Sequence, residues 1–153
     1  IPFVKYIDEQ YKILCPKHYK KQKEIADGTN RNYVIEDTSF TTVTVNKNFR
    51  TACHKDSGDY QDGFGNLIVY TEGRHDGGLF CLPEYRVAIN MENQDLLFVD
   101  VHKWHGNTEI SPLTNDWMRI SFVLYYREYM YKCKQPSEEL QKMKMDKTGY
   151  FTL

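Results

Sequence analysis

The sequence lacks closely spaced cysteines and any long run of apolar residues. Its four cysteines, at positions 15, 53, 81 and 133, stand singly, without the Cys-x-x-Cys spacing of a zinc knuckle or the density of a disulfide scaffold. A reduced, intracellular compartment is therefore expected: the cytoplasm, the nucleus, or the host cell of a virus or phage that encodes the chain. No apolar run approaches the roughly 20 residues that span a bilayer, so no membrane partner is expected.

Charge of one sign is also not in excess. Lys and Arg number 20 against 21 Asp and Glu, which gives a net charge of -1. This balance excludes the broad positive field of a strong nonspecific nucleic-acid binder, but it leaves open a nucleic acid held at a local site. The basic run from Lys17 to Lys23 is interpreted as a solvated helix face, with a phosphate-contacting patch as the alternative.

A chain of 153 residues fits one domain. We predict a single domain over 1–153, with a helical N-terminal part at 1–32, a β core at 33–130 and a C-terminal helix at 136–146. Pro16 suits the first turn of a helix and Gly28 suits its end. The chain begins at Ile1 without a charged-then-apolar leader, so we expect a processed or excised piece of a longer protein.

Short β-type runs separated by turn residues fill the middle of the chain. Eight strands are predicted, at Tyr33–Ile35, Phe40–Val45, Arg50–His54, Leu67–Tyr70, Leu79–Leu82, Arg86–Ile89, Leu96–Val99 and Met118–Tyr126. No helical pattern of 10–15 residues alternates with them, which excludes a parallel α/β sheet. The fold class is therefore mainly β, a sandwich or barrel with short helices at both termini.

Metal-ligating residue types occur at two places. His54 and Asp56 are two apart where a predicted strand runs into a Gly-containing loop, and residues at this spacing on a strand point to the same face, so the two can hold one ion. A third ligand from His102 or His105 would complete two imidazoles and one carboxylate, and Gly106 favours His105 because it allows a turn that aims the ring inward. This set leaves three positions open on an octahedral ion, which suits ferrous iron; zinc usually takes four ligands, often with Cys.

Arg119 stands inside the apolar run 117–123, which is predicted to be a strand. A guanidinium is costly to bury without an anion, and its planar fork matches a carboxylate. Ser121, two residues on, faces the same side. The alternative is an edge strand whose Arg119 faces water.

These residues together resemble a known enzyme family. His54-x-Asp56, then His105, then Arg119-x-Ser121 resembles the Fe(II)/2-oxoglutarate-dependent oxygenases, whose fold is the double-stranded β-helix, a cupin-like jelly roll. The longer stretch from Phe40 to Arg127 is similar to the TET/JBP branch, the nucleic-acid base oxygenases. The motifs that carry this closer resemblance are Asn46-Lys47-Asn48-Phe49-Arg50, Gly77-Gly78-Leu79 and His105-Gly106-Asn107.

The resemblance implies Fe(II), 2-oxoglutarate and O2 as cofactors and co-substrates. The metal ligands would be His54, Asp56 and His105, the 2-oxoglutarate-binding residues Arg119, Ser121 and Arg50, and the substrate-binding residues Asp59 and Asn48. Arg50 is equally consistent with contact to the substrate or with a structural role. Asp59 departs from the family, because TET enzymes have an asparagine at this position, three residues after the metal carboxylate, where it contacts the target base.

The implied function is hydroxylation of the 5-methyl group of a pyrimidine base in DNA, presented flipped out or single-stranded. An ionised Asp59 only accepts hydrogen bonds, so it suits the N3–H of thymine and repels the N3 lone pair of cytosine. Thymine is therefore expected over 5-methylcytosine. The alternatives are an oxygenase of the same type acting on a protein side chain, a free nucleoside or a small metabolite, and a non-enzymatic jelly-roll module. No protein partner can be inferred.

Overall fold

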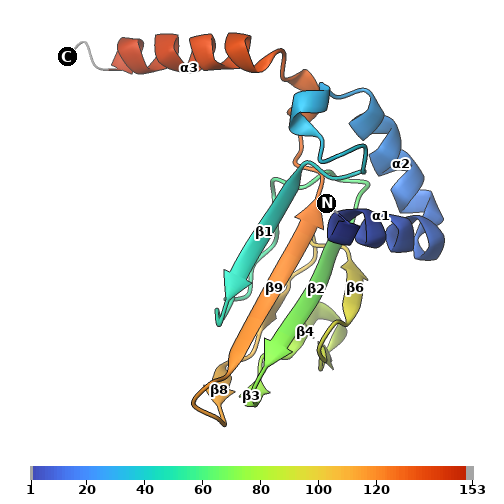
Figure 1. Ribbon diagram of the computed structural model, residues 1–153, viewed down its shortest axis with the longest axis vertical. Helices are drawn as coiled ribbons and strands as arrows, with labels where there is room; N and C mark the ends of the chain where they lie inside the picture. Colours follow the sequence, from blue (N-terminus) through green and yellow to red (C-terminus); the bar gives the residue numbers. More distant parts are fainter. Residues whose placement is uncertain (1, 151–153) are drawn as a thin grey trace.

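The structure, a computed structural model, describes residues 2–150, with side chains as far as residue 144. Its main sheet has four antiparallel strands in the order β1-β9-β2-β6 (Figure 1). These are β1 (Thr42–Lys47), β9 (Met118–Tyr125), β2 (Gly65–Glu72) and β6 (Leu96–Val99). The two longest strands, β2 and β9, pair along nearly their full length, with Tyr70 opposite Ile120. The apolar stretches of the sequence thus meet in the centre of the sheet.

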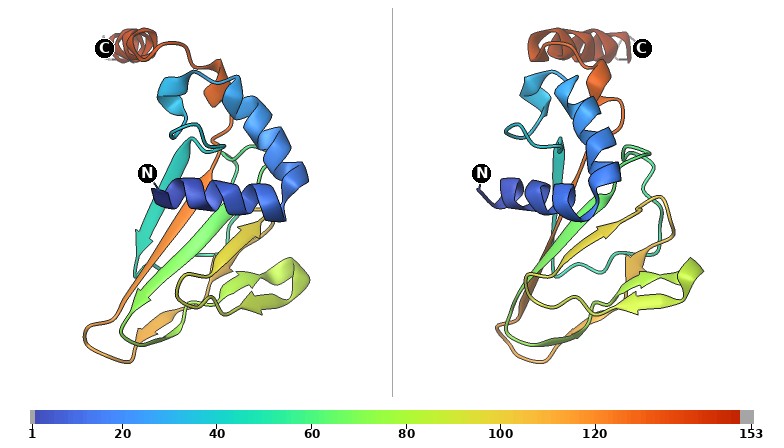
Figure 2. Two further views of the ribbon diagram at one scale, coloured as in Figure 1. Left: turned by 45° about the vertical axis from the view of Figure 1, so that its right-hand side comes forward. Right: turned by 90° about the vertical axis from the view of Figure 1, so that its right-hand side faces the viewer.

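Shorter strands form a second layer behind the main sheet. One small sheet has the order β5 (Val87–Ile89), β4 (Phe80–Leu82) and β7 (Gly106–Asn107), and β3 (His75–Gly77) pairs with β8 (Ile110–Pro112). Helix α1 crosses the opposite face of the main sheet (Figure 2). The molecule therefore has a helical side and a side formed by short strands and loops, and the second side carries the site described below.

The N-terminal part contains two helices, α1 (Pro2–Leu14) and α2 (Pro16–Asp27), followed by a 3₁₀ turn, η1 (Arg31–Tyr33). Pro16 begins α2, where its missing N–H costs nothing, and Gly28 follows the last turn, as predicted. The basic run of α2 is largely paired with acids on the surface: Lys20 with Glu24, Lys21 with Asp62 and Lys23 with Asp27. This pairing supports the solvated-face interpretation of that run.

Helix α1 packs through one face. Val4, Ile7 and Tyr11 recur at helical spacing and are buried against the main sheet and Phe40. The Tyr11 hydroxyl accepts a hydrogen bond from the Phe64 N–H at 3.0 Å, and burial raises the pKa of this phenol. Helix and sheet are thus joined by an apolar contact and one buried polar bond.

At the other end of the chain, η3 (Met130–Lys132) leads into α3 (Pro136–Tyr150), which extends away from the sheet (Figure 1). The helix includes the predicted range 136–146 and continues to residue 150. In the described part of the chain, residues 2–150, no helix is long and apolar enough to cross a membrane.

Most predicted strands are present, with ends that shift by at most two residues, but two predictions were wrong. Tyr33–Ile35 lies in η1 and the turn after it, where Glu36 and Asp37 have positive φ. Arg50–His54 is extended but forms only an isolated bridge at His54, because Asn48 at φ 50° turns the chain out of β1. The very short strands β3, β7 and β8 were not predicted.

Candidate metal centre

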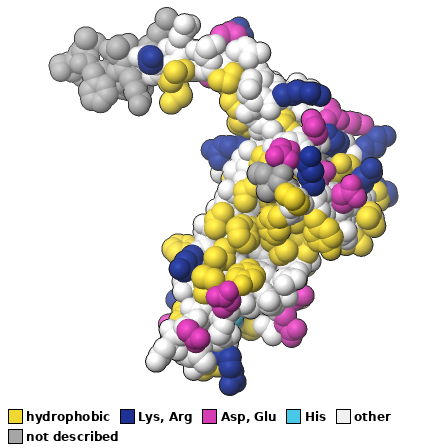
Figure 3. All heavy atoms as spheres, in the orientation of Figure 1, with side chains coloured by type: hydrophobic (Ala, Val, Ile, Leu, Met, Phe, Trp, Pro, Cys, Tyr) yellow, Lys and Arg dark blue, Asp and Glu magenta, His cyan; other side chains and the backbone are white. Residues whose placement is uncertain are grey.

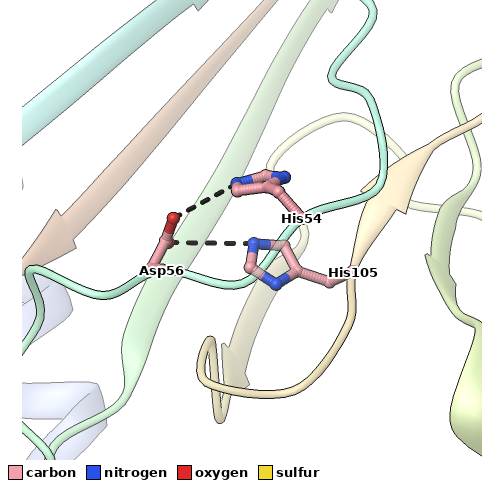
Figure 4. A group of neighbouring side chains, drawn as sticks. All are labelled: His54, Asp56 and His105. Carbon is pink, nitrogen blue, oxygen red and sulfur yellow. Dashed lines mark ion pairs between the residues drawn. The ribbon is translucent and has the colours of Figure 1, made fainter.

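Three side chains from distant parts of the sequence meet on the side of the short strands. His54 Nε2 lies 3.2 Å from one oxygen of Asp56, and His105 Nε2 lies 3.8 Å from the other (Figure 4). One ligand atom from each residue lies within 4.8 Å of the other two. These are the three residues that the sequence pattern selects, and their spacing is that of ligands around a single ion.

The backbone fixes this arrangement. His54 and His105 form an antiparallel bridge, exchanging N–H to carbonyl bonds of 2.8 and 2.9 Å, and the Asp56 N–H donates to the Val101 carbonyl at 3.0 Å. Gly106 makes the bridge possible, since a Cβ there would lie 3.0 Å from the Thr51 carbonyl oxygen. The glycine therefore serves close approach of two backbones rather than the turn that the sequence suggested.

The orientation of both rings is also set. His54 Nδ1 lies 2.8 Å from the Ala52 carbonyl oxygen, and His105 Nδ1 lies 2.9 Å from that of Lys103. Because a carbonyl only accepts, each Nδ1 carries the proton, and a neutral ring then presents the lone pair of Nε2 toward Asp56. This is the tautomer that a metal ligand needs.

His102, the alternative third ligand, lies outside the cluster. Its Nδ1 is 3.0 Å from Asp100 Oδ1, and its Nε2 is 3.2 Å from the carbonyl oxygen of Asp59. Both ring nitrogens of His102 thus lie within hydrogen-bonding distance of oxygens outside the cluster. The structure brings His105, and not His102, to His54 and Asp56.

The cluster opens into a cavity of about 400 Å³, whose wall includes Arg119 and Ser121. Arg119 is buried, with 6% of its surface exposed, and burial lowers the pKa of its guanidinium. Its Nη2 is 3.5 Å from the Gly78 carbonyl oxygen, and among residues 2–144 no carboxylate lies within 4.0 Å of it. A buried cation in this state is suited to bind an anion.

Glycines make room for Arg119. The backbone of Gly78, at φ 71°, lies close to the Arg119 side chain, and a Cβ at this residue would be 3.3 Å from Arg119 Nε. At Gly77, with φ 76°, a Cβ would be 1.9 Å from the Glu109 carbonyl oxygen. Both residues adopt left-handed conformations that glycine tolerates best. The Gly77-Gly78 pair thus leaves room for the Arg119 side chain at this end of the cavity.

Two other predicted site residues lie elsewhere. The side-chain oxygen of Asn48 accepts a hydrogen bond from the Arg119 backbone N–H at 2.7 Å, and the backbone N–H of Asn48 donates to the Arg119 carbonyl at 2.8 Å. Asn48 therefore holds the strand that carries Arg119, and its amide oxygen is already occupied. Arg50 is exposed and does not line the cavity.

Asp59 lies in the cavity wall and is buried, with 8% of its surface exposed. Its Oδ2 has no hydrogen-bond partner among the described residues. Burial, followed by the charge of Asp56, raises the pKa of this carboxyl to about 7. An unsatisfied carboxyl aimed into a cavity is suited to a hydrogen-bonding ligand.

The sequence analysis missed three cavity residues of strand β9 and its extension. Val123, Tyr125 and Arg127 continue the row that begins with Arg119 and Ser121, and all five line the cavity. The signal was available, because alternate residues of a strand share a face. Asn107 was also missed: its side chain accepts the Thr51 N–H at 2.7 Å and ties the His54 segment to β7.

Residues 1–128 match the Tet_JBP family, described as the oxygenase domain of the 2OGFeDO superfamily. The chain belongs to this family. Two similar relatives are the thymine dioxygenase JBP1 of Trypanosoma brucei brucei, 36% identical over 90% of this chain, and the bifunctional helicase and thymine dioxygenase JBP2 of the same organism, 40% identical over 79%. The chain spans only 17% and 11% of their respective lengths.

A solved structure supports the fold assignment of this Tet_JBP chain. NgTET1 in complex with 5mC DNA superposes with a TM-score of 0.71 over 94% of this chain and 56% of the other, at 14% identity. The likeness confirms the predicted double-stranded β-helix. The family match and the JBP1 relative confirm the TET/JBP resemblance that the sequence motifs indicated.

Proposed function

We propose that this domain is an Fe(II)- and 2-oxoglutarate-dependent dioxygenase that hydroxylates the 5-methyl group of thymine in DNA. The observation that carries the proposal is the convergence of His54, Asp56 and His105 beside the unpaired, buried Arg119 in one cavity. The family match and the relatives named thymine dioxygenases support it.

The residues present fit a ferrous ion. Two neutral imidazoles and one carboxylate, His54, His105 and Asp56, would hold the ion on one side and leave its other side open to the cavity. When bound, the iron together with 2-oxoglutarate and O2 supplies the oxidation of an unactivated C–H bond. The protein contributes preset ligand orientation and a partly enclosed cavity that limits access of water.

The anion-binding end of the cavity fits 2-oxoglutarate. The guanidinium of Arg119 would form paired hydrogen bonds to the carboxylate farther from the metal, and the Ser121 hydroxyl, on the same face of β9, would donate another. A buried anchor of this kind fixes one end of the co-substrate, so the other end reaches the metal in one orientation.

Asp59 is the proposed contact to the target base. It lies three residues after Asp56 on the cavity wall, and its Oδ2 is free to accept a hydrogen bond. In the ionised form it accepts the N3–H of thymine and repels the N3 lone pair of 5-methylcytosine. Above about pH 7, where Asp59 is ionised, wild-type protein should therefore prefer thymine, and Asp59→Asn should reduce that preference; equal turnover of both bases by wild type at this pH would contradict this assignment.

A base stacked in a duplex does not reach a metal within such a cavity, so the target nucleotide is flipped out or single-stranded. A protein that acts on DNA is expected inside a cell or an infected host cell. This location and the roles of the individual site residues stay predictions.

The test is anaerobic reconstitution with Fe(II) and 2-oxoglutarate, addition of O2 and a thymine-containing DNA strand, and mass spectrometry of the released nucleosides. We expect 5-hydroxymethyluracil with wild type and none with His54→Ala. Succinate formation without base oxidation would instead favour a protein side chain, free nucleoside or small metabolite as substrate. Absence of both products would contradict the dioxygenase assignment.

A further inference from the structure

The cavity-facing row of β9 has a cation at each end. Arg119 begins the row and Arg127 ends it, just beyond the last residue of the strand. Eight residues of extended chain separate their Cα atoms by roughly 26 Å. Arg119 is buried, whereas Arg127 is exposed, so the two mark the inner and outer ends of one cavity.

The position of Arg127 is fixed although its side chain is exposed. Its N–H donates to Thr41 Oγ1 at 2.8 Å, and it forms an antiparallel bridge with Asp59. The guanidinium lies across Gly58, where a Cβ would be 3.6 Å from Nη1. The backbone around Arg127 therefore holds it at the edge of the cavity, beside the proposed base contact.

The guanidinium of Arg127 is available to a ligand. In the part of the chain with described side chains, no carboxylate lies within 4.0 Å of it, and Asp59 acts on it only from a longer distance. The other exposed cation of the cavity wall, Lys55, is already engaged, with Glu84 at 3.6 Å and the ring of Trp104 at 5.4 Å. Arg127 is thus the outer cation with unused hydrogen-bonding capacity.

A second anion is needed to occupy this site. 2-Oxoglutarate is a five-carbon dicarboxylate, too short to reach from Arg119 at the inner end to Arg127 at the outer end. We propose that Arg127 binds a phosphodiester group of the nucleic-acid strand next to the target nucleotide while Asp59 contacts the base. This inference rests on the proposed function and adds to it the residue that binds the backbone of the substrate strand.

Such an anchor also accounts for how a chain of net charge -1 can act on DNA. A planar guanidinium matches two phosphate oxygens, and a single contact of this kind gives local affinity without a broad positive field.

The test compares wild type, Arg127→Gln, Arg127→Lys and the control Arg31→Gln, which removes an exposed charge remote from the cavity. Steady-state rates on a single-stranded thymine-containing 12-mer are measured at saturating 2-oxoglutarate and several NaCl concentrations. Arg127→Gln should raise the KM for the strand about five- to tenfold at low salt. It should also make the slope of log KM against log salt shallower by about 0.7, the share of one phosphate contact.

Arg127→Lys should keep most of the salt slope, because the charge remains, and Arg31→Gln should match wild type. If Arg127→Gln has the wild-type KM and the wild-type salt slope, the inference is overturned but the proposed function is not. The same holds if this variant raises the KM for 2-oxoglutarate as much as the KM for the strand. Wild type that oxidises thymidine, which has no phosphate, as efficiently as the strand also overturns it. Wild type that oxidises no thymine substrate at all overturns the proposed function, and the inference with it.

Discussion

At the scale of single residues, the protein's own hydrogen bonds set the orientation of the site. Backbone carbonyls orient both imidazole rings, and the Asn48 side chain holds the backbone of Arg119. The groups proposed to bind ligands have few hydrogen-bond partners within the protein. They are the Nε2 atoms of the two histidines, the Asp59 carboxyl and the guanidinium of Arg119. The chain thus bears the cost of uncompensated buried polar groups at the positions where a metal, a co-substrate and a base would bind.

Arg119 gives the first prediction. Arg119→Met removes a buried charge without a carboxylate partner and keeps much of the side-chain volume, so the ligand-free protein should unfold at the same temperature as wild type or a higher one. The same variant should lose 2-oxoglutarate turnover by at least about tenfold, since one charge-assisted contact accounts for that much. Thermal unfolding and succinate release measure the two effects. A strong loss of stability would show that Arg119 is a structural residue.

Asp59 gives a prediction on pH. Its pKa is raised to about 7, so the folded state binds its proton more tightly than the unfolded state, and wild type loses stability as pH rises from about 4 to 7. Asp59→Asn cannot titrate, so the free energy of unfolding of the variant relative to wild type should increase by about 2–3 kcal/mol between pH 5 and pH 8. Urea unfolding of metal-free protein at both pH values measures this change; a constant difference would contradict it.

At the scale of elements, the β3–β4 connection shapes the cavity through Gly77 and Gly78. Gly77→Ala should destabilise the fold by more than about 2 kcal/mol, because it adds a side chain at positive φ and a Cβ 1.9 Å from the Glu109 carbonyl oxygen. Gly28→Ala is the matched control, since its nearest contact would be 3.6 Å and its φ is negative. Chemical unfolding compares the two; equal effects would argue against a specific need for glycine at 77.

Patterns in the sequence predicted the secondary-structure elements that depend mainly on neighbouring residues in the chain. Short β-type runs bounded by turn residues gave β6 and β9 almost to the residue, and the two-residue period of a strand placed Arg119 and Ser121 on one face. The His54-x-Asp56 spacing gave two of the three clustered ligands, but the strand assumed to carry them is absent. That segment is held by the Asn107 side chain and by the backbone of His105, about 50 residues away, and such pairings leave no periodic trace in the chain.

At the scale of the whole molecule, hydrophobic side chains gather on the face of the main sheet next to α1 (Figure 3). They include Val45 and Tyr70 on the strands and Phe3 on α1, whose ring packs edge-on against Phe122. The catalytic side proposed above is the opposite one, so substitutions on the α1 face should affect stability rather than turnover.

Helix α3 should be dispensable for folding. It extends away from the sheet, and the family match ends at residue 128, before the helix begins (Figure 1). Removal of residues 136–153 should change the Tm by less than about 2 °C, which is no more than the shift that about 1 kcal/mol produces in a domain of this size. Thermal unfolding monitored by circular dichroism tests this; a drop of more than about 5 °C would show that α3 supports the core.

The most direct test is an anaerobic titration of the purified chain with Fe(II) in the presence of 2-oxoglutarate, followed by visible absorption. Chelation of the co-substrate to a ferrous ion gives a charge-transfer band. Wild type and His102→Gln should both develop this band at one iron per chain, while His105→Ala should not, because His105 and not His102 lies with His54 and Asp56. A band that survives in His105→Ala and disappears in His102→Gln would contradict the metal centre described here.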